Sequence, residues 1–165
     1  MKGECIMPES KTLERARKDQ REGKSTSTQA GEFVREEFHH IREGKHGARS
    51  ARQAIAIGLS KARRAGVKLP PPKAGHASKD VRSRAQRDYE KGMHGDGPAS
   101  PKRSRALTGA LRRVGHRAAS TIAISRQSRR SAKGRTAADR SAAASKAART
   151  RSKKSLRVGR SEGGI

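Results

Sequence analysis

The sequence is poor in the residues that build hydrophobic cores. It has no Trp, one Tyr and two Phe, and Leu, Ile, Val and Phe together make up 20 of its 165 residues. When such residues fall below about a fifth and the net charge is high, a chain is typically disordered over much of its length. Too little core remains to build the pocket that catalysis needs. We therefore expect a small folded piece with long basic extensions, no enzymatic activity and no cofactor.

The sequence also lacks the marks of secreted and membrane proteins. Its single Cys5 cannot form an intramolecular disulfide. No apolar run approaches the roughly 18 residues of a membrane-spanning helix, and no signal-peptide core is present. We expect a cytoplasmic protein with no membrane partner. Met7 is an alternative to Met1 as the start of the chain.

Positive charge is what the sequence has in excess. Lys and Arg number 41 against 15 Asp and Glu, a formal net charge of +26. Residues 1–70 carry 16 basic and 9 acidic side chains, and residues 71–165 carry 25 and 6. Such a chain attracts polyanions. The composition predicts a nucleic-acid partner, DNA first and RNA as an alternative, bound mostly by the second half of the chain.

Apolar residues at helical spacing predict a first core helix over about residues 29–43. Ser27 or Thr28 is expected to cap it. The helix also carries glutamates, which we interpret as a solvated face, with ion pairing to the next basic helix left open. The apolar face consists of Ala30, Phe33, Val34, Phe38 and Ile41.

A second core helix is predicted over residues 51–65. Ser50 and Gln53 have the spacing of a capping box, and Gly66 is a C-terminal cap. Small residues recur every fourth position and allow the Phe side chains of the first helix to approach closely. They are Ala54, Gly58 and Ala62.

Three prolines, residues 70–72, cannot continue a helix and predict a boundary. The fold class we expect is all-α: a charged, partly helical N-terminal segment (residues 1–27), a small helical hairpin (28–69) and a long, mostly disordered basic tail rich in Ala, Ser, Arg and Lys (70–165). Because some forty residues are marginal alone, a homodimer through the hairpin is also left open.

Short helices are predicted within the tail, transient in the free chain and stabilised on a polyanion. One covers about residues 80–91 and ends at a glycine-rich turn, residues 92–97. Another follows Ser100 and Pro101. A third, alanine-rich helix begins near Thr136, which has capping-box spacing to Asp139.

Two resemblances add to this reading. The tail, through residues 100–103 (Ser-Pro-Lys-Arg) and its alanine-spaced cations over 140–151, resembles the tails of H1-type linker histones and of Lys/Ala-rich bacterial nucleoid proteins. That resemblance implies sequence-tolerant DNA binding, histone-like and nucleoid-associated. Residues 32–69 resemble a small bacterial family of unknown function whose members are short, basic and loosely described as DNA-binding. This second resemblance implies a fold unit and no catalytic residues.

Two further patterns are weighed and set aside. Gly44-Lys-His-Gly47 resembles the backbone-clamping loop of KH domains, but the strands of that fold are missing and a plain interhelical loop is expected. His39, His40 and His46 lie near Glu36 and Glu43, without the spacing of a known metal motif. We expect these histidines to be solvated and no metal to be bound.

The predicted function is sequence-tolerant DNA binding through phosphates, by a nucleoid-associated or DNA-compacting accessory protein. Two alternatives stay open: an RNA- or ribosome-associated protein, and a protein-interaction module with a solubilising tail. The predicted nucleic-acid-binding residues are Lys45, Arg52, Arg63, Arg64, Lys102, Arg103, Arg112, Arg113, Arg129, Arg130, Arg149, Arg151, Lys153 and Lys154.

Overall fold

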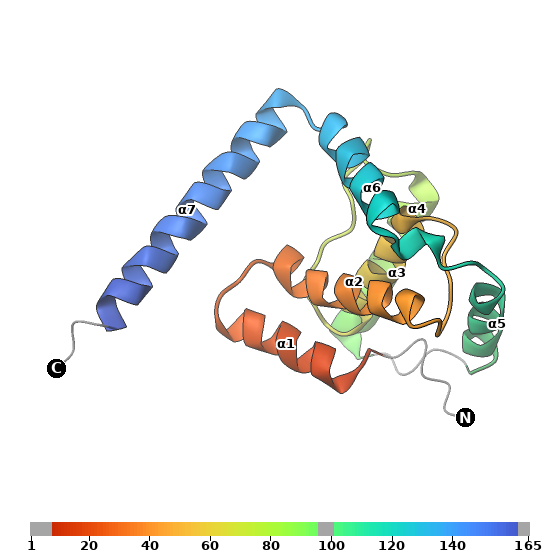
Figure 1. Ribbon diagram of the computed structural model, residues 1–165. Coiled ribbons are helices and arrows are strands. Elements are labelled where there is room, and N and C mark those ends of the chain that lie inside the picture. The colour runs from red at the N-terminus through yellow and green to blue at the C-terminus, as the bar shows by residue number, and fades with distance from the viewer. Residues whose placement is uncertain (1–7, 96–100, 162–165) are drawn as a thin grey trace. The chain divides into compact units, whose positions relative to one another are not determined.

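The structure, a computed structural model, describes residues 8–95 and 101–161, apart from the side chains of residues 101, 103, 104, 150 and 153–161. Every regular element in these residues is a helix, so the predicted all-α class is confirmed (Figure 1). The elements are α1 (Ser10–Arg21), α2 (Thr26–Arg42), α3 (Ala51–Arg64), α4 (Lys79–His94), α5 (Pro101–Arg112), the 3-10 helix η1 (Arg117–Ala119), α6 (Thr121–Lys133) and α7 (Ala137–Ser161).

The chain divides into two compact units, Met1–Ser125 and Arg126–Ile165. The first unit holds the packed helices, and its order of contact is α1 on α2, α2 on α3, and α3 on α4. Among the described residues, no helix combines the length and apolar character needed to cross a membrane. Met7 and Cys5 lie outside the described residues.

Serine side chains begin the core helices. Ser50 accepts from the Gln53 backbone N–H at 3.2 Å, as the predicted capping box requires. The cap predicted for α2 is wrong in position. Ser25, rather than Ser27 or Thr28, accepts from the Thr28 N–H at 3.3 Å, so α2 begins three residues earlier than expected. The polar run before α2 offered several cap candidates of equal chemistry, which spacing alone did not separate.

Helices α2 and α3 pack through the predicted ridge of small residues. Ala54 and Ala62 are fully buried. At Gly58 an added Cβ would lie 2.7 Å from the Cα of Val34, so the two backbones meet there without room for a side chain. This close approach brings the polar residues at the C-terminal end of α2 within reach of α3.

Two hydrophobic clusters flank that contact. One is centred on Phe38 and the other on Phe33, and both are assembled mostly from alanines. The first contains Phe38, Ile41, Ala48, Ala51, Ala54, Ala118 and Ala119. The second contains Ala16, Ala30, Phe33, Ala62 and Val67. Alanines bury little area each, so the chain builds a core from few large side chains by bringing helices close together.

The folded unit extends past the prolines that were expected to end it. Helix α4 packs on α3, and an added Cβ at Gly92 would lie 1.8 Å from the Arg63 carbonyl oxygen. The glycine-rich segment predicted as a flexible turn therefore supplies a close helix contact. One helical turn before Gly92, Asp88 of α4 accepts hydrogen bonds from Ser60 and Arg64 of α3 at 2.6 and 2.7 Å. The division of the chain falls after Ser125, not at the prolines.

The loop between α2 and α3 is covered by the last turn of α5 and the residues that follow it. Gly47 donates its N–H to the Leu111 carbonyl at 3.0 Å, and a Cβ at Gly47 would overlap the Val114 carbonyl. A clamp for a nucleic-acid backbone needs this loop open. The loop is an interhelical connection, as expected, and the described residues contain no strand of a KH fold.

In the second unit, Thr136 and Asp139 form the predicted capping box. The Thr136 N–H donates to Asp139 Oδ2 at 3.2 Å, and the Asp139 N–H donates to Thr136 Oγ1 at 3.1 Å. Helix α7 follows, and all of its described side chains are exposed. Its helicity rests on alanine propensity and this cap rather than on a buried face.

Substitution of Gly58 tests the α2–α3 contact. Gly58→Ala should destabilise the chain by about 1–3 kcal/mol, because the methyl group meets backbone. Gly31→Ala, in α2 with no atom within 4 Å of the added Cβ, is the matched control and should stabilise by about 0.5–1 kcal/mol through helix propensity. Urea unfolding followed by circular dichroism measures both. Equal effects of the two substitutions would contradict the packing.

Candidate functional site

Five ionisable side chains are buried together where α2, α3 and the intervening loop meet. Helix α2 supplies Glu36, Glu37 and His40, the loop supplies His46, and α3 supplies Lys61. Their exposed fractions are between 0% and 6%. We call this group the buried charge cluster.

Lys61 is the cation of the buried charge cluster. Its Nζ lies 2.9 Å from Glu37 Oε2 and 3.4 Å from Glu36 Oε1. The prediction that the glutamates of α2 form a solvated face is therefore wrong for Glu36 and Glu37, and the ion pairing with α3 that was left open is present. The close approach at Gly58 positions Lys61 beside them. A buried carboxylate is costly without such a partner, so this pairing permits the acidic helix to pack.

The two buried histidines are held from outside the cluster. His40 Nε2 lies 2.8 Å from Glu9 Oε1, and His46 Nδ1 lies 3.2 Å from the Gly47 carbonyl oxygen. Hydrogen bonds from His40 first and from Lys45 second lower the pKa of Glu9 to about 2. Glu9 is therefore ionised near neutral pH, and its carboxylate accepts a hydrogen bond from His40 Nε2–H.

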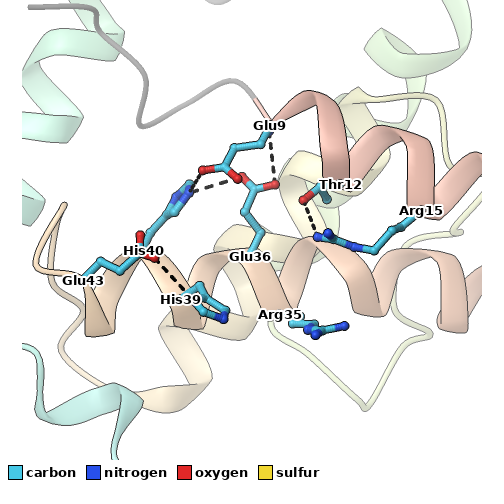
Figure 2. Close-up of a pocket in the computed structure, with 8 residues that line it drawn as sticks. All are labelled: Glu9, Thr12, Arg15, Arg35, Glu36, His39, His40 and Glu43. Carbon is cyan, nitrogen blue, oxygen red and sulfur yellow. Dashed lines mark hydrogen bonds and ion pairs between the residues drawn. The ribbon is translucent and has the colours of Figure 1, made fainter.

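A polar pocket of about 210 Å³ opens beside the cluster, between α1 and α2 (Figure 2). Figure 2 shows His40 directed at Glu9, while His39 pairs with Glu43. The adjacent histidines His39 and His40 thus have different surroundings. The pocket is lined by Glu9, Thr12, Arg15, Arg35, Glu36, His39, His40 and Glu43.

The expectation that all three of these histidines are solvated is wrong for two of them. His39 is exposed, whereas His40 and His46 are 2% and 1% exposed. No spacing along the chain marks these two histidines as neighbours, because His46 joins the cluster through a turn at Gly44, whose φ is +74°. Helical periodicity does not extend across such a turn.

Four predicted nucleic-acid-binding residues lie on α3 and on the loop before it, and three of them are held by partners within the chain. Lys45 pairs with Glu9 and Glu43, both at 3.1 Å, and these carboxylates raise its pKa. Arg64 pairs with Asp88. Arg52 is exposed.

Arg63 lies in a different place from the one expected. Its side chain is buried, and its guanidinium donates to the Leu69 and Pro70 carbonyl oxygens at 3.2 and 3.4 Å. It ties the chain leaving α3 back onto that helix. Arg63 is therefore not presented to a phosphate backbone in this structure, because the turn after α3 folds over it.

The predicted binding residues beyond α4 are exposed wherever their side chains are described. The exposed ones are Lys102, Arg112, Arg113, Arg129, Arg130, Arg149 and Arg151. The side chains of Arg103, Lys153 and Lys154 lie outside the described part of the chain.

Sequence reasoning missed two cations of α6. Arg126 and Lys133 line a shallow hollow of about 300 Å³ together with the predicted Arg129 and Arg130. The four positions are spaced i, i+3, i+4 and i+7, which places them on one helix face. That spacing is readable from the sequence alone. We call these four residues the basic face of α6.

Residues 10–73 match the model of a family of unknown function (DUF6496). The match covers less than half of the chain. It extends further in both directions than residues 32–69, for which the sequence showed a resemblance to an uncharacterised family, and it supports that resemblance. It spans α1 to α3 and includes every residue of the buried charge cluster. No curated protein and no solved structure matches the chain.

Replacement of Lys61 tests whether the cluster is held by this one cation. Lys61→Met should destabilise the chain by about 3–5 kcal/mol, because two carboxylates stay buried without a partner. Adding Glu36→Gln and Glu37→Gln should recover most of the loss. Lys18→Met, which removes a cation paired with Glu22 on the surface of α1, is the control and should change stability by less than about 0.5 kcal/mol.

Denaturant unfolding of the four chains measures these differences. The outcome that contradicts the account is a cost for Lys61→Met no larger than that for Lys18→Met.

Proposed function

We propose that the chain binds nucleic acid through phosphates without reading base sequence, duplex DNA being the first candidate. The basic face of α6 carries this proposal. Its four cations are exposed, and α6 contains no Asp or Glu along its length. Cations at this spacing can follow a phosphate backbone, and each phosphate neutralised releases a bound counterion.

The distribution of acidic partners supports placing the affinity in the second unit. In the first unit, Lys24, Lys45 and Lys61 each lie within ion-pair distance of two carboxylates, and Arg15 and Arg64 of one. Residues 126–165 carry 13 basic and two acidic side chains. The excess positive charge of residues 126–165 would therefore be neutralised best by an external polyanion.

The chemistry of the second unit suits sequence-tolerant contact. Arg and Lys side chains position a protein on phosphate, whereas base reading needs side chains arranged to enter a groove. Helix α7 has only exposed side chains where they are described, so neutralisation by a polyanion would favour its helical form. The resemblance of the tail to linker-histone and bacterial nucleoid-protein tails supports the same role, a nucleoid-associated accessory that compacts DNA.

The test is the salt dependence of duplex DNA binding by the full chain. Replacing Arg126, Arg129, Arg130 and Lys133 with Gln should lower the slope of log K against log salt by up to about 3–4, because each lost phosphate contact removes about 0.9. The matched control replaces Lys79, Arg84, Arg87 and Lys91 of α4, which are exposed and lie in the first unit. It removes the same charge and should change the slope less.

Competition separates the nucleic-acid partners. Duplex DNA should displace a labelled duplex more effectively than the same mass of structured RNA. Equal competition would favour the RNA-associated alternative. A salt-independent affinity, or equal slopes for the α6 and α4 variants, would contradict the proposal.

A further inference from the structure

We propose that Glu37, His40 and His46 form a binding site for one divalent transition-metal ion, Zn²⁺ being the best match. The three side chains each offer a ligand atom, and these atoms all lie within 4.8 Å of one another. All three are at least nine-tenths buried. The site is independent of the basic face of α6 and of the proposed nucleic-acid binding.

Buried polar atoms without a hydrogen bond gather at this site. Among the described residues, five buried side-chain N or O atoms have no hydrogen-bond partner, and four of them belong to these three side chains: both carboxylate oxygens of Glu37, Nδ1 of His40 and Nε2 of His46. Lys61 forms an ion pair with Glu37 Oε2 at 2.9 Å, so Oε1 of Glu37 and the two ring nitrogens are the atoms left for a further ligand. Buried polar atoms are normally partnered, and a group concentrated in one place calls for an explanation such as an ion.

Hydrogen bonds on the outer side fix which nitrogens are available. His40 donates Nε2–H to the Glu9 carboxylate, and His46 donates Nδ1–H to the Gly47 carbonyl. His46 therefore turns its unprotonated Nε2 toward Glu37 Oε1, and His40 has its unprotonated Nδ1 available within 4.8 Å of both. A carboxylate or a backbone carbonyl holding the second nitrogen is the usual outer support of a metal-bound histidine, since it sets the tautomer and the ring orientation.

One pair of ligand atoms already has the separation that an ion requires, and the third atom lies within 4.8 Å of both. A tetrahedral Zn²⁺ with bonds of about 2.0–2.1 Å separates its ligand atoms by about 3.3 Å, and His46 Nε2 lies 3.2 Å from Glu37 Oε1. Glu37 and His40 are three residues apart on α2, so they project from one side of the helix. Two nitrogens and one carboxylate favour zinc and its neighbours over Mg²⁺ or Ca²⁺, which prefer oxygen ligands.

A proton on His46 is the competing explanation. It would pair with Glu37 and balance the charge of Glu36, Glu37 and Lys61. It would still leave His40 Nδ1 without a partner, because Glu36 Oε1 is 4.0 Å away, beyond hydrogen-bond reach. A divalent ion satisfies both rings and the carboxylate together, and its added charge is offset by Glu9 behind His40.

The experiment titrates untagged full-length chain, first treated with a chelator and dialysed, with Zn²⁺ and separately with Co²⁺. We expect one saturable equivalent, a rise in the unfolding temperature and the visible absorption of tetrahedral Co²⁺. His46→Gln should abolish saturable binding. His39→Gln, which alters the exposed neighbour of His40, should leave affinity unchanged.

The supporting carboxylate gives a second comparison. Glu9→Ala should weaken Zn²⁺ affinity by about 10–100-fold, because it removes the partner that orients His40. Glu43→Ala is the control. It removes the other carboxylate that pairs with Lys45, and Glu43 lies just past the last residue of α2. It should change affinity less than about twofold.

Histidine nitrogen NMR on the unmodified sequence keeps the proposal testable if a variant does not fold. Zn²⁺ should shift Nδ1 of His40 and Nε2 of His46 and leave their protonated nitrogens in place. The proposal is overturned by the absence of saturable binding, by binding that survives His46→Gln, or by a doubly protonated His46 that zinc does not change.

Discussion

The placement of Lys61 is the constraint on which the folded unit depends. Helix α2 carries two adjacent glutamates into the interior, which is tolerable only if a cation arrives from another helix. Lys61 arrives because α3 approaches α2 without an intervening side chain at Gly58. Packing and electrostatics therefore require each other here: the glycine contact places the lysine, and the lysine permits the acidic helix to be buried.

That internal pairing shapes the charge available to other molecules. The first unit directs several lysines and arginines at its own carboxylates, whereas the second unit has few carboxylates and displays a basic face on α6. A protein with so few large apolar residues gains its fold from close alanine and glycine contacts plus buried ion pairs. Its net positive charge is densest in residues 126–165, which carry 13 basic and two acidic side chains in 40 residues, and a polyanion is the natural match for such a segment.

Helical periodicity and capping chemistry were enough to predict α2 and α3 to within about three residues, because those signals are local. The burial of Glu36, Glu37, His40 and His46 was not predictable in that way. It depends on Glu9, Lys61 and the chain after α5, which come from distant positions in the sequence. Gly92 was misjudged for the same reason, since a glycine reads as flexible until the helix that it contacts is known.

The central claim is that the second unit contacts nucleic acid while the first unit forms the packed fold. Its most direct test is amide NMR of the full chain during titration with a short duplex DNA at physiological salt. The account predicts shift changes concentrated in residues 126–152, with the amides of residues 10–64 nearly unchanged. Changes centred on α2 and α3, with the second unit unaffected, would contradict it.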